Sequence, residues 1–176
     1  MGLCFSQNGR NKRVLIKKIK PDYNIESIYN IDIEHLLEYG VKALFFDLDS
    51  TIMKSKSGKF NFRTLQFLND LRRNFKIAII TNNTKMSYLK QVRSQTDIPI
   101  YAKAKKPDPR ALLKACRDFK IQPVDAVMIG DRPLSDMLAG KRAGTMTILV
   151  DSIAKDEEGV LVRFVRFLER LTIAKE

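Results

Sequence analysis

Five short apolar runs recur along the chain, separated by stretches with apolar residues at helical spacing. The runs occupy 42–46, 76–80, 98–102, 126–129 and 145–150, and the expected helices occupy 64–74, 85–94, 109–119 and 134–143. Continuous apolar runs of this length, alternating with amphipathic helices, are typical of strands buried on both faces of a parallel sheet. The pattern therefore predicts an α/β fold with a doubly wound, Rossmann-like parallel sheet of about five strands.

The two ends of the chain differ from this alternating middle part. Residues 1–20 carry six basic residues and no acid, and we expect them to form a flexible basic arm, followed by a single domain over 21–176. A short helix is expected over 33–39, with Asp32 as its N-cap and Gly40 closing it. Residues 160–171 are amphipathic, and this stretch either lies at a bilayer interface or, as we favour, docks its apolar side on the sheet.

Composition excludes several classes of protein. Of the 176 residues, 44% are hydrophobic and 30% are charged, which is a globular composition without the apolar run of ~20 residues that a membrane span needs. Two cysteines, Cys4 and Cys116, cannot build a disulfide framework or a zinc fold. A net charge of +12 favours an anionic partner. We expect a cytoplasmic protein, with peripheral contact with an anionic membrane left open.

Residues that follow the first two runs offer oxygen ligands and hydrogen-bond donors. In parallel sheets of this kind, ligands bind beyond the carboxyl ends of the strands. Asp47 and Asp49 follow the first run, and such paired carboxylates suit Mg²⁺, while one of them can act as a nucleophile. Thr81 and Asn82 follow the second run, where a hydroxyl either donates to a phosphoryl oxygen or caps the next helix.

Residues that follow the next two runs add a cation and two further acids. Lys106 directly precedes a proline, which disfavours the helical conformation, and its ammonium group could stabilise negative charge. Gly130 and Asp131 follow the fourth run, and Asp136 lies on the helix after it. Each signal alone has an ordinary structural explanation, as a turn, a cap or a solvated lysine run. Their order on four successive strand ends predicts one site.

In this order the motifs resemble those of the haloacid dehalogenase (HAD) superfamily of phosphatases. The residues that meet the four motifs are, in order, Asp47, Asp49 and Thr51; Thr81; Lys106, with Lys105 the less favoured alternate; and Asp131 with Asp136. The resemblance implies that Asp47 attacks phosphorus and becomes an aspartyl phosphate. It also implies that Asp49 protonates the leaving group and then activates water.

The same resemblance implies a division of the other residues between substrate and metal. Thr81, Asn82 and Lys106 are the expected substrate-binding residues. The expected Mg²⁺ site consists of Asp47, the main-chain carbonyl of Asp49, Asp131 and Asp136, the last of which anchors a metal-bound water or orients Lys106.

Motif spacing leaves no room for the cap domain that many members of the superfamily carry. Asp47 and Thr81 are 34 residues apart, and Thr81 and Lys106 are 25 apart, so a turn and one helix fill each interval. An open site favours a phosphoryl group displayed on a large carrier. The motifs together resemble subfamily IIIA, which includes YqeG-type proteins and phosphatidylglycerophosphate phosphatases.

This resemblance implies a membrane-displayed substrate such as phosphatidylglycerophosphate. Two alternatives remain: a HAD phosphatase of a soluble phosphate ester, nucleotide or phosphoprotein, and a basic RNA- or ribosome-binding module with little turnover. The complete set of acids, hydroxyl and lysine argues against the second, so nucleic acid is not the expected partner. The sequence leaves the oligomeric state open.

Overall fold

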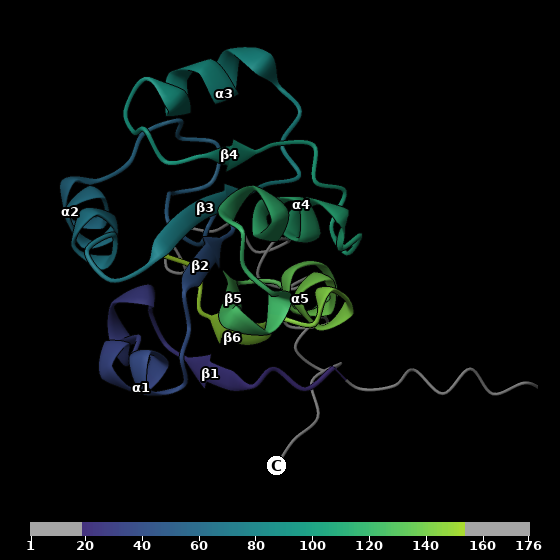
Figure 1. Ribbon diagram of the computed structural model, residues 1–176. Coiled ribbons are helices and arrows are strands. Elements are labelled where there is room, and N and C mark those ends of the chain that lie inside the picture. Colours follow the sequence, from purple (N-terminus) through teal and green to yellow (C-terminus); the bar gives the residue numbers. More distant parts are fainter. Residues whose placement is uncertain (1–18, 154–176) are drawn as a thin grey trace, which may run out of the picture.

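A wholly parallel sheet of six strands forms the centre of the protein (Figure 1). The structure is a computed structural model that describes residues 19–153. The strand order is β1-β6-β5-β2-β3-β4. In chain order the strands are β1 (Tyr23–Ile25), β2 (Ala43–Phe46), β3 (Lys76–Ile80), β4 (Ile100–Tyr101), β5 (Ala126–Gly130) and β6 (Met146–Val150). This order, with crossovers between parallel neighbours, confirms the predicted doubly wound α/β fold.

Helices cover both faces of the sheet. They are α1 (Ile33–Glu38), α2 (Phe62–Leu71), α3 (Met86–Arg93), α4 (Arg110–Phe119) and α5 (Leu138–Ala143), with a π-helical turn at Pro133–Met137 and short 3₁₀ turns at Ile28–Asn30 and Pro123–Asp125. Buried residues of α1, α2 and α3 share one core cluster, and those of α4 and α5 share a second. The sheet is therefore the middle layer of three.

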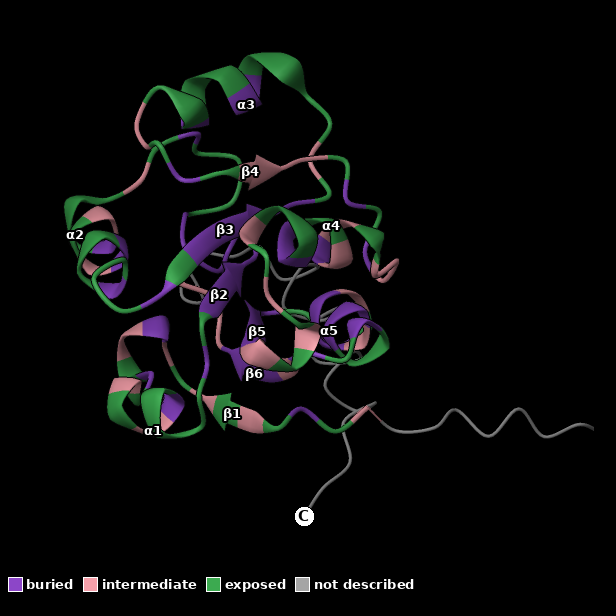
Figure 2. Ribbon diagram, in the orientation of Figure 1, coloured by how far each residue is buried: buried purple, intermediate pink, exposed green. Residues whose placement is uncertain are grey.

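Strand β2 lies at the centre and has no exposed face (Figure 2). Leu44 and Phe46 pack into the core on the α1–α3 side, whereas Ala43 and Phe45 pack into the core on the α4–α5 side. Alternate side chains of a strand point to opposite faces, so a continuous apolar run can satisfy both cores. This burial on both sides explains why residues 43–46 of the first predicted run are all apolar.

The predicted helices are confirmed, with boundaries that differ from the prediction by at most four residues; the largest difference is at the start of α5, where the π-helical turn occupies Pro133–Met137. Helix α1 begins after Asp32, whose Oδ1 accepts the main-chain N–H of His35 at 3.0 Å, and Gly40 follows it with φ +74°. Within residues 19–153, the segments between the motifs contain no additional cap domain. Over the same residues, no helix has the length and apolar character needed to cross a membrane.

Strand β1 is an edge strand that the apolar pattern did not reveal. Its attachment to β6 depends on Asp22, which accepts hydrogen bonds from Lys141 Nζ at 2.6 Å and from the N–H and hydroxyl of Thr147 at 2.8 Å each. Burial opposes ionisation of Asp22, but these hydrogen bonds outweigh it and lower the pKa of the carboxyl. The predicted arm, up to residue 18, and the amphipathic stretch 160–171 lie outside the described residues.

Replacing Asp22 should loosen β1 from the sheet. Since the ion pair with Lys141 is partly exposed, we expect Asp22→Ala to lower the free energy of unfolding by about 1 kcal/mol. The lowered pKa makes this contribution complete above the ordinary carboxyl pKa of 3.8, and it is lost as pH falls through the folded-state value. Urea unfolding measures the change, and hydrogen exchange at β1 locates it.

Asp97→Ala is the matched control for Asp22, because it removes an exposed carboxylate that pairs with Arg72. It should change the stability much less. Equal effects of the two substitutions, or unchanged exchange protection in β1, would show that Asp22 does not attach the strand.

Candidate active site

The carboxyl ends of β2, β3 and β5 bring the motif residues to one edge of the sheet. Asp47 directly follows β2 and its N–H donates to the carbonyl of Ile129 in β5 at 2.9 Å. Thr81 directly follows β3, and Asp131 directly follows β5. The chain reverses after Asp47 through Ser50, which has φ +71° and is buried. The structure therefore places the first, second and fourth motifs side by side.

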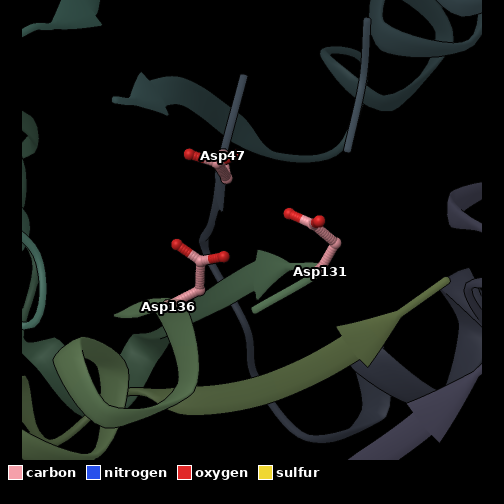
Figure 3. A group of neighbouring side chains, drawn as sticks. All are labelled: Asp47, Asp131 and Asp136. Carbon is pink, nitrogen blue, oxygen red and sulfur yellow. The ribbon is translucent and has the colours of Figure 1, made fainter. Parts of the chain in front are cut away.

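Three carboxylates form a buried cluster at this edge (Figure 3). One oxygen from each of Asp47, Asp131 and Asp136 lies within 4.8 Å of the others. Asp136 reaches the cluster because residue 130 is a glycine: a Cβ there would lie only 2.5 Å from the Asp136 side chain. Unscreened carboxylates at this separation repel one another, so the cluster needs cations.

Lys106 supplies one cation and is itself almost completely buried. Its Nζ contacts an oxygen of Asp47, lies 2.7 Å from Asp136 Oδ1, and donates to the carbonyl of Ile80 at 2.7 Å. Lys105, the alternate, is exposed. The lysine that the structure joins to the carboxylates is therefore Lys106.

Burial and charge shift the protonation of this pair. Burial raises the pKa of Asp47 to about 6, with the charges of Asp136 and Asp49 adding to the rise and Lys106 opposing it. For Lys106, burial works against the charged form, but the charges of Asp136 and Asp47 outweigh it and raise the pKa above its usual value. Lys106 is therefore an ammonium ion at neutral pH.

The donor set fits a divalent cation. Three buried carboxylates converge at this point, and the buried ammonium group of Lys106 contacts Asp47 and Asp136. The third, Asp131, accepts a hydrogen bond from the Thr51 hydroxyl at 3.1 Å, which orients it. Carboxylate oxygens are hard ligands of the kind that Mg²⁺ prefers, so the cluster could hold this ion.

The side chain of Asp49 does not join the three clustered carboxylates. It accepts hydrogen bonds from the Tyr88 hydroxyl at 2.6 Å and from the N–H of Lys56 at 3.1 Å, both at Oδ1. Asn83 Nδ2 lies 3.4 Å from the other oxygen, Oδ2. Asp49 is therefore fixed separately from Asp47, although the two are only two residues apart.

Tyr88 is a site residue that the sequence analysis missed. It lies on α3, and its ring is buried in the α1–α3 core. Burial and the hydrogen bond to Asp49 raise the pKa of its hydroxyl, so this group remains a donor. Helical spacing marks position 88 as a core position, but no local pattern shows that its hydroxyl meets Asp49.

Thr81 and Asn82 connect β3 with the lysine loop. Thr81 is buried, and its carbonyl accepts the N–H of Ala104 at 3.0 Å. The Asn82 amide pairs with the main chain of Lys106: Oδ1 accepts its N–H at 2.6 Å, and Nδ2 donates to its carbonyl at 3.1 Å. Asn82, an expected substrate ligand, thus holds the backbone of Lys106.

Comparisons with known proteins agree with this geometry. A family model described as HAD-hydrolase-like matches residues 103–161. The probable phosphatase YqeG of Bacillus subtilis is 33% identical over 158 residues, which cover 89% of this chain and 91% of that protein. Phosphatidylglycerophosphate phosphatase 1 of Arabidopsis thaliana is 25% identical over 86% of this chain, but the match covers only 46% of the plant protein.

A solved structure supports the fold. The crystal structure of a HAD phosphatase from Thermococcus onnurineus superposes with a TM-score of 0.53 at 17% identity, covering 68% of this chain and 90% of that one. At this identity the likeness shows the architecture alone. Because YqeG matches along almost its whole length, this chain belongs to the haloacid dehalogenase superfamily, as one of its phosphatases.

Proposed function

We propose that the protein is a Mg²⁺-dependent phosphomonoester hydrolase that works through an aspartyl-phosphate intermediate. The observation that carries this proposal is the buried contact of Lys106 with Asp47, beside Asp131 and Asp136. A nucleophilic carboxylate needs nearby positive charge when a phosphoryl group with its own negative charge approaches. Asp47, Asp131 and Asp136 would hold or support the ion, which would supply that charge neutralisation.

Two carboxyl groups divide the chemistry. An oxygen of Asp47 attacks phosphorus, the bond from phosphorus to the leaving oxygen breaks, and Asp49 gives that oxygen its proton. A water then attacks the phosphorus of the aspartyl phosphate while Asp49 takes its proton. The bond to Asp47 breaks, releasing phosphate and restoring both carboxyl groups. Lys106 and Thr81 would hold the phosphoryl oxygens during both steps.

Tyr88 positions Asp49 for proton transfer in this proposal. A general acid must lie within hydrogen-bond reach of the leaving oxygen in a defined orientation. The hydrogen bonds from Tyr88 and from the N–H of Lys56 fix Oδ1 of Asp49. Oδ2, which accepts the longer hydrogen bond from Asn83 Nδ2 at 3.4 Å, is the oxygen that we assign to proton transfer. Tyr88 touches no reacting atom, so it is a positioning residue.

The substrate that we propose is a phosphomonoester on a membrane lipid, such as phosphatidylglycerophosphate. Two observations support this choice. The described chain has no cap domain that would enclose a small substrate, and a plant relative has the name phosphatidylglycerophosphate phosphatase 1. A soluble phosphate ester is the alternative, and a substrate panel separates the two.

The first prediction concerns the nucleophile and the substrate. Full-length protein with Mg²⁺ should release phosphate from phosphatidylglycerophosphate in detergent micelles with a higher kcat/KM than from glycerol 3-phosphate or nucleoside monophosphates. Asp47→Asn should lower kcat at least about a thousandfold on every substrate, because an amide cannot accept the phosphoryl group. Colorimetric phosphate release measures both.

Asp108→Asn is the control for Asp47→Asn, because it removes a carboxylate of the lysine loop that pairs with Arg110 outside the cluster. It should retain turnover. A folded Asp47→Asn protein with normal turnover would exclude the aspartyl-phosphate mechanism. Preference for a soluble ester would exclude only the lipid substrate.

The second prediction concerns the metal. Mg²⁺ should raise the Tm of the wild-type protein, since binding to the folded state stabilises by about 2.7 kcal/mol at a hundred times Kd. Asp131→Asn should weaken Mg²⁺ binding at least about tenfold and remove this shift in Tm at the same Mg²⁺ concentration. Asp70→Asn, which changes an exposed carboxylate of α2, should leave the shift unchanged. Full turnover after exhaustive EDTA treatment contradicts the proposal.

The third prediction concerns Tyr88. Loss of one hydrogen bond to a charged group corresponds to about 1.5–3 kcal/mol, so Tyr88→Phe should lower kcat about tenfold or more with little change in KM. This loss should occur on an alkyl phosphate, whose leaving group needs a proton. On 4-nitrophenyl phosphate, whose leaving group departs as an anion, the loss should be much smaller.

Tyr101→Phe is the matched control for Tyr88→Phe, because its hydroxyl donates to Asp118 at 2.8 Å, away from the carboxylate cluster. Tyr101→Phe should leave kcat unchanged on both substrates. Equal losses on the two substrates in the Tyr88 variant would indicate a structural effect, and Asp49→Asn shows how large the dependence on the leaving group can become.

A further inference from the structure

The connection between β2 and α2 passes beside Asp49, the proposed general acid. Its residues 54–60, which we call the 54–60 loop, include Lys56, whose N–H donates to Asp49 Oδ1 at 3.1 Å. Tyr88, on α3, donates to the same oxygen at 2.6 Å. The orientation of the Asp49 carboxylate therefore depends on the position of this loop as well as on the position of α3.

Local preference does not give the 54–60 loop its path. Lys56 has φ +59°, a left-handed conformation that residues with a side chain rarely adopt, and Gly58 has φ +65°. Within the loop, the N–H of Ser57 donates to the Lys54 carbonyl at 3.1 Å, which closes a turn but does not fix that turn to the rest of the protein. A left-handed lysine persists only where surrounding contacts impose it, so contacts from outside the loop must hold it.

Gln95 provides such contacts from a distant part of the chain. It lies just after α3, and its Nε2 donates to the Gly58 carbonyl at 2.7 Å. Its Oε1 accepts the N–H of Phe60 at 3.1 Å. A single side-chain amide therefore holds the main chain of the loop on both sides of Lys59, across 35 to 37 residues of sequence.

The main chain at Gly58 packs closely against the same face of α3. A Cβ at residue 58 would lie 2.6 Å from Gln91 Oε1, so the loop lies directly against the Gln91 side chain. The main chain of Gly58 also hydrogen-bonds the Tyr88 hydroxyl. Positions 88, 91 and 95 are three and four residues apart, which places them on one helical face. This face holds the loop and Asp49 together.

We propose that Gln95 is a positioning residue: by anchoring the 54–60 loop, it keeps the N–H of Lys56 on Asp49 Oδ1 and so directs Oδ2 toward the leaving oxygen of the substrate. This rests on the proposed function, because it deepens the role of Asp49 as the general acid. Gln95 touches no reacting atom and acts through the loop. Tyr88 thus fixes the carboxylate from the helix, whereas Gln95 fixes it from the loop.

A purely structural role is the alternative explanation, because Gln95 Nε2 also donates to the Gln91 carbonyl at 2.8 Å, near the end of α3. Ser94 Oγ donates to that same carbonyl, also at 2.8 Å. Ser94→Ala is therefore the matched control for Gln95. It removes a side-chain hydrogen bond from the same end of the helix and leaves both contacts of Gln95 with the loop in place.

Gln95→Leu, made in the full chain and assayed with Mg²⁺, tests the proposal. It roughly keeps the size of the side chain and removes all three hydrogen bonds. We expect kcat/KM to fall about tenfold on glycerol 3-phosphate, less on phenyl phosphate, and less than about twofold on 4-nitrophenyl phosphate, because a general acid helps most where the leaving oxygen is most basic. Ser94→Ala should change none of the three values by more than about twofold.

Hydrogen exchange at the amide of Lys56 gives a readout that is independent of activity. Exchange of this N–H should be at least about tenfold faster in Gln95→Leu than in the wild-type protein, and unchanged in Ser94→Ala. Thermal unfolding checks that each variant is folded at the assay temperature. If the leucine variant is not folded, Gln95→Glu, which keeps the acceptor for Phe60 and loses the donor to Gly58, should show the same pattern.

Three outcomes would overturn the positioning role of Gln95. Equal losses of kcat/KM on the three esters would show a structural role alone. No loss on glycerol 3-phosphate, or unchanged exchange at Lys56, would show that the loop keeps its position without Gln95. Asp49→Asn distinguishes these outcomes from failure of the proposed function: an equal loss on all three esters in that variant would mean that Asp49 is not the general acid.

Discussion

The buried ammonium group of Lys106 is the interaction on which the site depends. It contacts Asp47 and Asp136 and also the carbonyl of Ile80, with its side chain only 1% exposed. Removal of one partner from such a buried pair costs about 3–5 kcal/mol, because the other charge is left uncompensated. The same contacts hold three loops together and oppose the rise that burial causes in the pKa of Asp47, the proposed nucleophile. One group therefore contributes to both stability and the proposed chemistry.

The parallel sheet makes this arrangement possible. Burial of β2, β3 and β5 on both faces fixes their register, and their carboxyl ends then lie at a common edge. Small features complete the site: Gly130 gives Asp136 room to approach, and Asn82 holds the main chain of Lys106 through two hydrogen bonds. The position of the reacting groups is therefore determined by backbone geometry at the strand ends.

The loops at the carboxyl ends of the strands have buried side chains that differ in charge from their exposed ones. Side chains that point inward, such as Asp47 and Lys106, are buried and balance one another's charge. Side chains that point outward, such as Lys85 and Lys103, are exposed and basic. A buried carboxylate cluster beside exposed basic side chains suits a phosphorylated substrate, which is the arrangement that the proposed function describes.

The sequence by itself determined five of the six strands, the approximate bounds of the five helices and the residues at the strand ends. Apolar runs long enough to be buried on both faces leave few alternatives to a parallel sheet, and parallel strands end at one edge.

Only the tertiary structure decided the rest. Strand β1 is three residues long, too short for a period, and it is held by Asp22 through partners more than a hundred residues away. The choice of Lys106 over Lys105 depends on which side chain points inward, and the contact between Tyr88 and Asp49 joins residues 39 positions apart. The local spacing of apolar residues predicts which positions are buried, but the partner of a buried polar group depends on how distant segments pack.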